Sequence, residues 1–402
     1  MLPKAILNAF TNDSKEEALT ALRIYLNDEN NNISAEAHHQ ASVLEEQYGD
    51  WRRAGASHNA CIQLAANNPV GLLYAGHWLK TSGFDEGAAA LFSLCQDLNP
   101  SFIGLIANSG QSTETIKHSN QADTHLRNYL SNHHRQTLNT KKASRIQQAA
   151  WVRTHDKTID TKIAGKLTHY APSLFFIDQL KKQPSYSSAE FAWANELLKQ
   201  RKAIKAELGA FLASKHNVEL IRPYLQGAPN AFEGMNDLVN SANWSAIDLF
   251  RDGDCSKQIE SAFPKTITAL AQVPCYQLEE TPFEVFFSIL KPGQIISSHY
   301  GQSNHSLTVH LPIDIPDHCY LDVDSERLSW QQDDLLIFDD NFLHSASNKS
   351  AKDRIVLIFS IWHPDLSKNE RTSIQTAFKA RMQWLKQRWT LVNRDFAQAL
   401  IK

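Results

Sequence analysis

Apolar positions in the first hundred residues recur with helical spacing and then repeat as a unit. Four positions return 34 residues later with the same or a similar residue: Gly49, Ala54, Cys61 and Leu64 become Gly83, Ala88, Cys95 and Leu98. A period of about 34 residues is that of tetratricopeptide arrays, in which pairs of helices stack. Small residues at Gly76 and Ala88 allow two such helices to approach closely. We therefore predict a helical, tetratricopeptide-like region over residues 1–120.

Two functions fit this repeat region. It can form a concave surface that docks a protein or peptide partner, or it can be a helical packing domain without a ligand. Only two units are clear, whereas about three are needed for a stable array. Both interpretations therefore stay open.

The pattern between the repeats and the second half of the chain also predicts a helix. An apolar stripe with helical spacing runs over residues 188–213, and Ser188 is a candidate N-cap. The stripe consists of Phe191, Leu197, Leu198, Ile204, Leu208, Phe211 and Leu212. Such a helix would pack across the outside of a following β-domain. We assign residues 121–213 to a helical linker and packing region.

After Leu220 the sequence pattern changes to short apolar runs separated by turn residues. Five runs read as strands, namely 283–290, 306–313, 319–323, 335–338 and 354–362. Many short strands with no helices between them favour a sandwich, jelly roll or barrel. We predict an α+β chain in which residues 214–366 form a β-domain of this kind.

The last segment, residues 367–402, predicts one long amphipathic helix. Its apolar face steps by three or four residues through Ile374, Phe378, Met382, Leu385, Trp389, Val392 and Phe396. Lys368 to Lys402 contains eight Lys or Arg and two Asp or Glu. A nucleic-acid or membrane-surface role is conceivable from this charge. We favour a helix docked on the protein with a basic, solvated face.

Composition excludes several classes of protein. With 402 residues, 42% apolar content and a net charge of −3, the chain reads as an ordinary globular protein that does not target nucleic acid. The five cysteines form no CxxC pair, which argues against a zinc ribbon and fits a reducing compartment. No apolar run reaches the roughly 20 residues that span a bilayer. Without an apolar leader after Met1, we expect a cytoplasmic location.

The candidate chemistry lies in the strand-rich segment. His299 and His344 lie 45 residues apart (344 − 299), and Arg354 follows the second by ten (354 − 344). All three fall in or beside strand-like runs. Two imidazoles from different strands can hold a metal, and the planar fork of an arginine pairs with carboxylate. That layout suits an oxygenase that uses Fe(II) and 2-oxoglutarate.

Arg354 opens an apolar run, where an arginine is costly unless it is paired. A cosubstrate carboxylate is one partner that would satisfy it. A buried salt bridge to Asp339 or Asp340 is the alternative. We interpret these two aspartates as acceptors that fix a turn, rather than as metal ligands.

The segment from about residue 220 to 366 resembles the aspartyl/asparaginyl β-hydroxylases. The resemblance depends on the order and spacing of short motifs, none of which is specific alone. They are Pro292-Gly293, His299-Tyr300-Gly301, Asn304, His310-Leu311, Ile337-Phe338-Asp339-Asp340, His344, Arg354 and Trp362-His363-Pro364.

The resemblance implies a role for each of six side chains. In the family two histidines hold the iron and water fills the third place, so His299 and His344 would be the ligands, with Gly301 where related oxygenases carry a carboxylate. Arg354 with Ser288 would clamp the distal carboxylate of 2-oxoglutarate. The same resemblance places His310 near the other carboxylate, as a hydrogen-bond donor, and Trp244 at the entrance.

The chain departs from the family in one motif. Members commonly carry arginines in an Asn-x-Arg-Leu-Arg-x-His pattern, whereas here the two positions are Ser306 and Thr308. Arginines there would pair with an acidic substrate group or with 2-oxoglutarate. Their replacement argues against peptidyl aspartate as the substrate and leaves open a neutral side chain, a free amino acid or a carrier-bound one.

The resemblance implies a double-stranded β-helix that hydroxylates an unactivated carbon with Fe(II), 2-oxoglutarate and O₂. The β-carbon of an aspartyl or asparaginyl residue is one candidate. Two alternatives remain open. The place beside Gly301 could hold a halide, which would make the protein a halogenase, or the chain could be a non-catalytic tetratricopeptide adaptor with a degenerate oxygenase fold.

Overall fold

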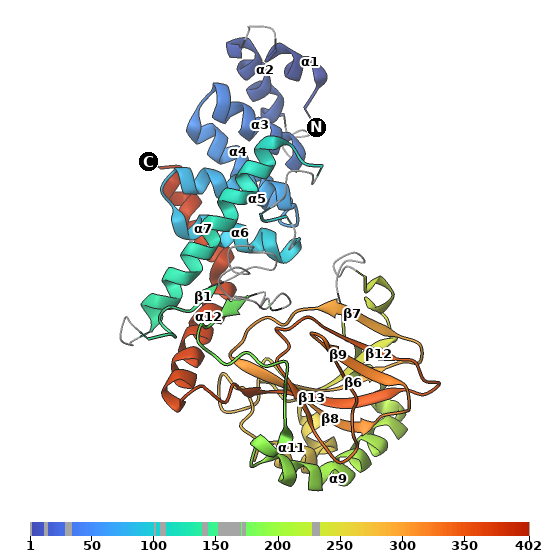
Figure 1. The fold of residues 1–402 in the computed structure, drawn as a ribbon. Helices are drawn as coiled ribbons and strands as arrows, with labels where there is room; N and C mark the ends of the chain where they lie inside the picture. The colour runs from blue at the N-terminus through green and yellow to red at the C-terminus, as the bar shows by residue number, and fades with distance from the viewer. Residues whose placement is uncertain are drawn as a thin grey trace. The chain divides into compact units, whose positions relative to one another are not determined.

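The structure is a computed structural model that describes residues 2–11, 15–28, 34–99, 102–104, 110–138, 144–151, 170, 174–226 and 234–401. The chain divides into two compact units, residues 1–133 with 380–402 and residues 134–379. Figure 1 shows helices in the first unit and mainly sheets in the second. Two helices, α7 (Thr113–Thr137) and α12 (Lys368–Ala399), contribute residues to both units.

The first unit is built from helices, three of which begin at polar caps. Its helices are α1 (Lys4–Ala9), α2 (Lys15–Asn27), α3 (Ala35–Tyr48), α4 (Trp51–Leu64), α5 (Pro69–Thr81), α6 (Asp85–Leu98) and parts of α7 and α12. Ser34, Asp50 and Asn68 each accept hydrogen bonds from backbone N–H groups in the first turn of α3, α4 and α5. These donors have no partner within the helix, so the caps fix where each helix begins.

Helix pairs in this unit repeat with the period found in the sequence. Helix α5 begins 34 residues after α3 (69 − 35), and α6 begins 34 residues after α4 (85 − 51). A Cβ on Gly76 would lie 2.5 Å from the Phe92 ring, so α5 and α6 approach as closely as the glycine permits. The helical character of the N-terminal region is thereby confirmed. Its identity as a tetratricopeptide array stays a prediction.

The second unit contains two principal antiparallel sheets and a small pair, β1 (Ala150–Trp151) with β2 (Phe175–Phe176). The four-stranded sheet has the order β10 (Glu326–Leu328), β9 (Cys319–Val323), β12 (His344–Asn348), β7 (Ile295–His299). The seven-stranded sheet has the order β3 (Ser185–Tyr186), β11 (Leu336–Phe338), β8 (Ser306–Asp314), β13 (Arg354–Trp362), β6 (Glu284–Leu290), β5 (Trp244–Arg251), β4 (Ile221–Pro223).

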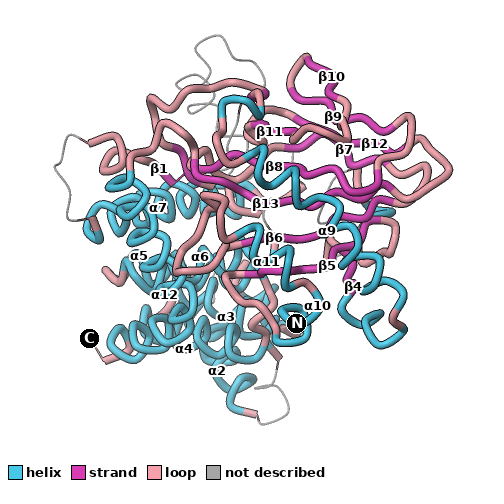
Figure 2. Tube along the Cα trace, turned by 90° about the horizontal axis from the view of Figure 1, so that it is seen from below, coloured by secondary structure: helices cyan, strands magenta, loops and turns pink. Residues whose placement is uncertain are grey.

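Alternation along the strands gives the large sheet two buried faces. Leu290 and Val356 face the small sheet and join a core with Ile296 and Leu321 of that sheet. Side chains that point to the other face of the large sheet, such as Phe287, pack against three helices. These helices are α9 (Ala194–Ala213), α10 (Lys257–Ala262) and α11 (Pro264–Leu270), and Figure 2 shows α9 lying across the large sheet.

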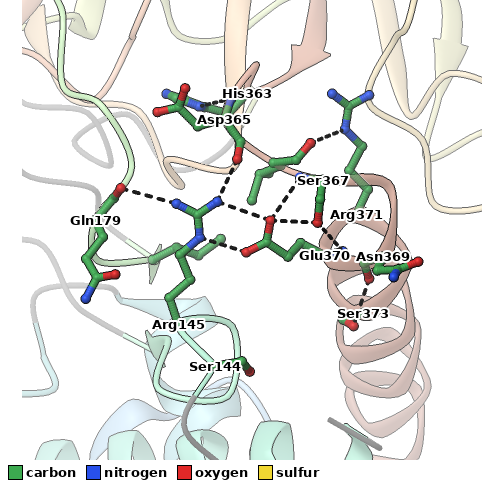
Figure 3. Close-up of polar contacts among 12 residues, drawn as sticks. Ser144, Arg145, Gln179, His363, Asp365, Ser367, Asn369, Glu370, Arg371 and Ser373 are labelled. Atoms are coloured by element: carbon green, nitrogen blue, oxygen red, sulfur yellow. Dashed lines mark hydrogen bonds and ion pairs between the residues drawn. The ribbon is translucent and has the colours of Figure 1, made fainter. Parts of the chain in front are cut away.

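A polar cluster fixes the start of α12 (Figure 3). Ser367 and Glu370 form a reciprocal capping pair, since the N–H of Ser367 donates to Glu370 Oε2 at 2.9 Å and the N–H of Glu370 to Ser367 Oγ at 3.4 Å. Arg145 donates two hydrogen bonds to the same carboxylate, from Nε to Glu370 Oε1 at 2.7 Å and from Nη2 to Oε2 at 3.1 Å. It also donates to the backbone carbonyls of Asp365 and Gln179. Arg145 thus ties three segments of the second unit together.

Most predicted elements are observed close to their predicted bounds. All five predicted strands are present, and the C-terminal helix α12 begins at Lys368. The predicted N-cap at Ser188 is wrong. Ser187 caps a short 3₁₀ turn, η1 (Ser188–Glu190), and α9 begins only at Ala194. Two more such turns are η2 (Lys215–Leu220) and η3 (Asn236–Leu238).

The four segment boundaries drawn from the sequence stay predictions. The basic side of α12 is less solvated than expected, because Arg388 pairs with Asp97, and Arg394 with Glu86. Within the described parts of the chain, no helix is both long and apolar enough to cross a membrane.

Candidate active site

One cavity of ≈ 160 Å³ is lined by all six side chains that the sequence singled out. The large sheet contributes Trp244 from β5, Ser288 from β6, His310 from β8 and Arg354 from β13. The small sheet contributes His299 from β7 and His344 from β12. Residues up to 110 positions apart (354 − 244) therefore meet at one place in the fold.

Strand pairing places the two histidines directly opposite each other. His344 opens β12 and is the register partner of His299 at the end of β7. Their ring centroids lie 4.1 Å apart with the rings tilted by 54°. Side chains opposite each other in an antiparallel pair point to the same face, so both imidazoles enter the same cavity.

Both imidazoles are held in the same tautomer. His299 Nδ1 lies 2.8 Å from the Ser297 carbonyl oxygen, and His344 Nδ1 lies 2.9 Å from that of Phe342. A carbonyl only accepts, so each Nδ1 carries the hydrogen and each Nε2 keeps its lone pair. Burial lowers the pKa of both histidines to about 4, which leaves them neutral at pH 7. Neutral imidazoles oriented through one nitrogen are what a divalent metal ion requires.

The space beside the histidine pair is filled by Asp340. A Cβ added to Gly301 would lie 2.2 Å from Asp340 Oδ1 and 2.4 Å from its Cγ. The carboxylate accepts from Thr308 Oγ1 at 3.1 Å and lines the cavity. Among the described residues, no group of three His, Cys, Asp or Glu side chains is placed to hold a metal ion. The chain therefore offers two imidazoles with the half-buried Asp340 carboxylate beside them.

The neighbouring Asp339 behaves as the sequence predicted, and Asp340 does so in part. Asp339 Oδ1 accepts from the backbone N–H of Asn341 at 3.0 Å and from its Nδ2 at 2.6 Å, which fixes the turn. Asp340 Oδ1 accepts from Asn341 Nδ2 at 3.3 Å, as expected of a turn-fixing acceptor, but its carboxylate also lines the cavity. Burial raises the pKa of Asp340 to about 6.

Arg354 lines the cavity and is fully buried, and no carboxylate among the described residues pairs with it. It is 1% exposed, and its Nε and Nη2 atoms have no hydrogen-bond partner among the described residues. The guanidinium carbon lies 5.3 Å from the Trp330 ring centroid, and burial lowers the pKa to about 10. The alternative of a salt bridge to Asp339 or Asp340 is excluded, since neither pairs with Arg354. A buried cation with two unused donors is costly unless a ligand supplies an anion.

Two tryptophans orient the polar groups around this arginine. Trp244 Nε1 donates to Ser288 Oγ at 3.0 Å, and Trp330 Nε1 donates to His310 Nδ1 at 3.1 Å. An acceptor at Nδ1 puts the hydrogen of neutral His310 on Nε2. Burial and the Arg354 charge both lower the pKa of His310 well below its usual value. His310 is therefore a neutral donor at its Nε2.

The lining farther from Arg354 is less buried, and we call it the open end of the cavity and the part around Arg354 the closed end. At the open end Glu284 is exposed and Tyr224, Thr308, Asp340 and Ser360 are half-buried, with the buried Phe286 two residues from Glu284 on β6. Ser360 is the register partner of Thr308, one of the two positions where the family commonly carries arginine. Small hydroxyl side chains therefore occupy this part of the wall.

Residues 198–364 match the family model described as aspartyl/asparaginyl beta-hydroxylase. This segment contains both sheets except β3, together with every side chain that lines the cavity. The predicted resemblance is confirmed. Residues 198–364 are similar to the aspartyl/asparaginyl β-hydroxylase family.

Several curated proteins are similar to this domain. An aspartate beta-hydroxylase domain-containing protein 2 from Mus musculus is 29% identical over 183 residues, which cover 41% of this chain and 53% of that protein. The Homo sapiens aspartyl/asparaginyl beta-hydroxylase is 27% identical over 53% of this chain and 27% of its own length. An ornithine lipid ester-linked acyl 2-hydroxylase from Rhizobium tropici is 30% identical over 189 residues, which cover 46% of this chain and 63% of that protein. The chain thus spans between about a quarter and two thirds of these relatives.

Sequence reasoning missed three contributors to the site. Trp330 lies in a loop between β10 and β11, where no periodicity marks it. Glu284 lies within the predicted strand 283–290 and Tyr224 lies outside the predicted strands, but neither belongs to a motif. Asn304, part of the family resemblance, does not line the cavity. Its Oδ1 accepts from the Ile177 N–H and its Nδ2 donates to the Ile177 carbonyl, at 2.8 Å each.

Proposed function

We propose that the second unit is an Fe(II)- and 2-oxoglutarate-dependent hydroxylase built on a double-stranded β-helix. The observation that carries the proposal is one cavity that combines two neutral imidazoles with free Nε2 lone pairs and a buried arginine with unused donors. The hydroxylase names of the relatives support the reaction type. When bound, Fe(II) with 2-oxoglutarate and O₂ supplies the oxidising power to hydroxylate a C–H bond, releasing succinate and CO₂.

His299 and His344 would hold the iron through Nε2. Their Nδ1–H bonds to backbone carbonyls fix both ring planes before the metal binds, so little reorganisation is needed. Asp340, beside Gly301, would hold a water or a substrate hydrogen-bond donor at the edge of the metal site. Leaving one side without a protein ligand keeps room for the cosubstrate and substrate.

Arg354 and Ser288 would bind the distal carboxylate of 2-oxoglutarate. The Nε and Nη2 atoms of Arg354 form one edge of the guanidinium fork, and this edge matches a carboxylate with two parallel hydrogen bonds. Trp244 already donates to Ser288 Oγ, so the hydroxyl hydrogen of Ser288 is free to donate in turn. His310 would donate its Nε2–H to the other end of the cosubstrate.

Asp340 also bears on the choice between hydroxylation and halogenation. A halogenase must keep a halide beside the iron, in the place that glycine opens. Here the Asp340 carboxylate fills the space next to Gly301, and with a pKa of about 6 it is mostly charged at pH 7. An anion would be repelled from that place, which favours hydroxylation.

The substrate is proposed only by class, as an amino-acid side chain in a peptide or a related small molecule. We also propose that the helical unit docks a protein or peptide partner, because its helix pairs repeat as in docking arrays. The catalytic set of the second unit weighs against a purely non-catalytic adaptor.

The proposal is tested by loading the full chain anaerobically with Fe(II) and 2-oxoglutarate and then admitting O₂. We expect succinate to form only when all three are present, since the cosubstrate is consumed slowly even without prime substrate. His344→Ala, loaded identically, should form none. Succinate formation that does not require iron, or that survives in His344→Ala, would refute the assignment.

A further inference from the structure

The charges that line the cavity are divided between its two ends. Arg354 is the one lysine or arginine that lines it within the described parts of the chain, and it lies at the closed end. The open end presents the carboxylates of Glu284 and Asp340. Once Arg354 is paired with the cosubstrate, no lining cation remains to receive a negatively charged substrate group. A substrate group that reaches the open end meets carboxylates and hydroxyls.

Glu284 points into the cavity because of its place on β6. Residues two apart on a strand share a face, so Glu284, Phe286 and Ser288 lie in a row that runs from the open end towards Arg354. Ser288 and Phe286 are buried, whereas Glu284 is exposed at the mouth. Glu284 therefore lies where an entering substrate would pass.

An aromatic wall adjoins this carboxylate. The Tyr224 ring stacks on Trp244 with centroids 4.1 Å apart and lies 5.1 Å from the Phe286 ring. All three rings line the cavity together with Glu284. Aromatic faces beside a carboxylate are the chemistry that recognises organic cations, because the ring quadrupole and the negative charge both attract them.

The nearby Arg222 does not line the cavity, although its guanidinium carbon lies 5.6 Å from the centroid of the Tyr224 ring. Arg222 binds the Asp248 carboxylate through Nε and Nη2, at 2.6 and 2.9 Å, and Nη1 binds the carbonyls of Pro223 and Tyr224. Four of its five N–H groups are thus used. The pKa of the Glu284 carboxyl is raised, first by partial burial and then by the Asp248 charge, so Arg222 does not outweigh these effects.

We propose that the open end of the cavity binds a protonated amine of the substrate, with Glu284 as counter-ion and Tyr224 and Phe286 as its aromatic wall. The proposal rests on the proposed function, because it treats this cavity as the hydroxylase active site. It explains why hydroxyl side chains at Ser306 and Thr308 stand where family members carry arginines. Arginines at the open end would repel a protonated amine.

Matched blocked amino acids test the charge preference. In ligand-observed NMR titrations of the full chain with Mn(II) and 2-oxoglutarate, Nα-acetyl-lysine methylamide should bind about tenfold more tightly than its neutral norleucine counterpart, as expected for one charge-assisted contact. Nα-acetyl-glutamate methylamide should bind no better than the neutral probe. Norleucine methylamide, with a free α-amine, shows whether a side-chain or a backbone amine is preferred, and preference for either supports the proposal.

Two variants locate the effect. Glu284→Gln should lose the tenfold preference, whereas Glu260→Gln, the same change on α10 outside the cavity, should keep it. Both replacements are at exposed positions, and circular dichroism melting verifies that each protein folds. Equal binding of cationic and neutral probes, tighter binding of the glutamate probe, or an unchanged preference in Glu284→Gln would overturn the proposal. Succinate formation by the wild type separates this failure from a failure of the proposed function.

Discussion

The molecule contains two histidine pairs of nearly the same spacing, one in each unit. His77 of α5 and His118 of α7 have ring centroids 3.9 Å apart, and His299 and His344 have centroids 4.1 Å apart. Burial lowers the pKa of His77 to about 4, the same value as in the second pair. Neither proximity nor a depressed pKa therefore distinguishes the proposed metal-binding pair from the other pair.

Orientation and surroundings make the difference. The rings of His77 and His118 stack at 21°, and their Nδ1 atoms have no hydrogen-bond partner among the described residues. The rings of His299 and His344 are tilted by 54°, and each Nδ1 donates to a carbonyl two residues earlier. Only the second pair shares a cavity with Arg354. A metal site is recognised by nitrogens that are fixed on one side and free on the other.

The largest expected effect comes from removing one histidine of the second pair. His299→Ala or His344→Ala should abolish iron-dependent succinate formation, because two protein ligands leave no spare. His77→Ala and His118→Ala, the matched pair from the helical unit, should retain it. If the first two variants keep near-wild-type iron affinity and turnover, the two pairs are equivalent and our distinction is wrong.

A second large effect is expected at Arg354. In Arg354→Met the apparent KM for 2-oxoglutarate should rise by about one to two decades, since a charge-assisted bidentate contact contributes roughly 1.5–3 kcal/mol. The melting temperature without cosubstrate should stay the same or rise, because an unpaired buried cation is removed.

Thermal shift measurements with and without 2-oxoglutarate separate these two outcomes for Arg354. Stabilisation by the cosubstrate should be present in the wild type and lost in Arg354→Met. An unchanged KM in the folded variant would make Arg354 a structural residue.

An intermediate effect tests how fully the space beside the second pair is occupied. Gly301→Ala should lower the free energy of unfolding by about 1–3 kcal/mol, the usual cost of overpacking, because its Cβ would overlap Asp340. In an Asp340→Ala background the same change should cost less than about 1 kcal/mol. Urea unfolding of the four proteins gives the coupling energy. Additive costs would show that Asp340 does not fill that space.

Gly301→Asp extends this test to turnover. The introduced carboxylate must displace Asp340, so we expect succinate formation to fall while iron affinity holds or rises through added negative charge. Parallel iron binding and succinate assays compare the variant with the wild type. Faster, coupled turnover would instead indicate a decayed centre with three protein ligands.

The smallest effect concerns the first pair and pH. The folded pKa of His77, about 4, lies below its ordinary value of 6.5, so the unfolded chain binds the proton more tightly. Its contribution to stability is fully present above pH 6.5 and is lost as the pH falls through 4. His77→Phe keeps a stacking ring without the titration and should reduce the acid sensitivity by on the order of 1 kcal/mol. Identical pH profiles of the two proteins in urea unfolding would contradict this.

Strong apolar patterns made much of the fold predictable. The five apolar strands and the long C-terminal helix follow directly from their sequence periodicity. Strands β7 and β12 were not predicted, because Ser297-Ser298 and Ser345-Ala346-Ser347 carry little apolar signal and depend on pairing with each other. The spacing of the two histidines identified them as candidates, but it did not predict that they lie opposite each other in paired strands.

The roles of Trp330 and Asp340 depend on tertiary contacts that local sequence does not encode. Trp330 reaches His310 and Arg354 from a loop, and the Asp340 carboxylate enters the space that Gly301 leaves. Both contacts join residues that are distant along the chain. Because glycine has no side chain, the sequence predicted an open space beside Gly301. In the structure the Asp340 carboxylate fills that space.

The most direct test of the central claim is the position of a bound metal ion. Crystals of the full chain grown anaerobically with Mn(II) and 2-oxoglutarate would locate the metal by anomalous scattering. We expect one strong peak about 2.0–2.3 Å from Nε2 of both His299 and His344, as for imidazole ligands in general, and none at His77 and His118. A peak at the helical pair, or none between His299 and His344, would contradict the account.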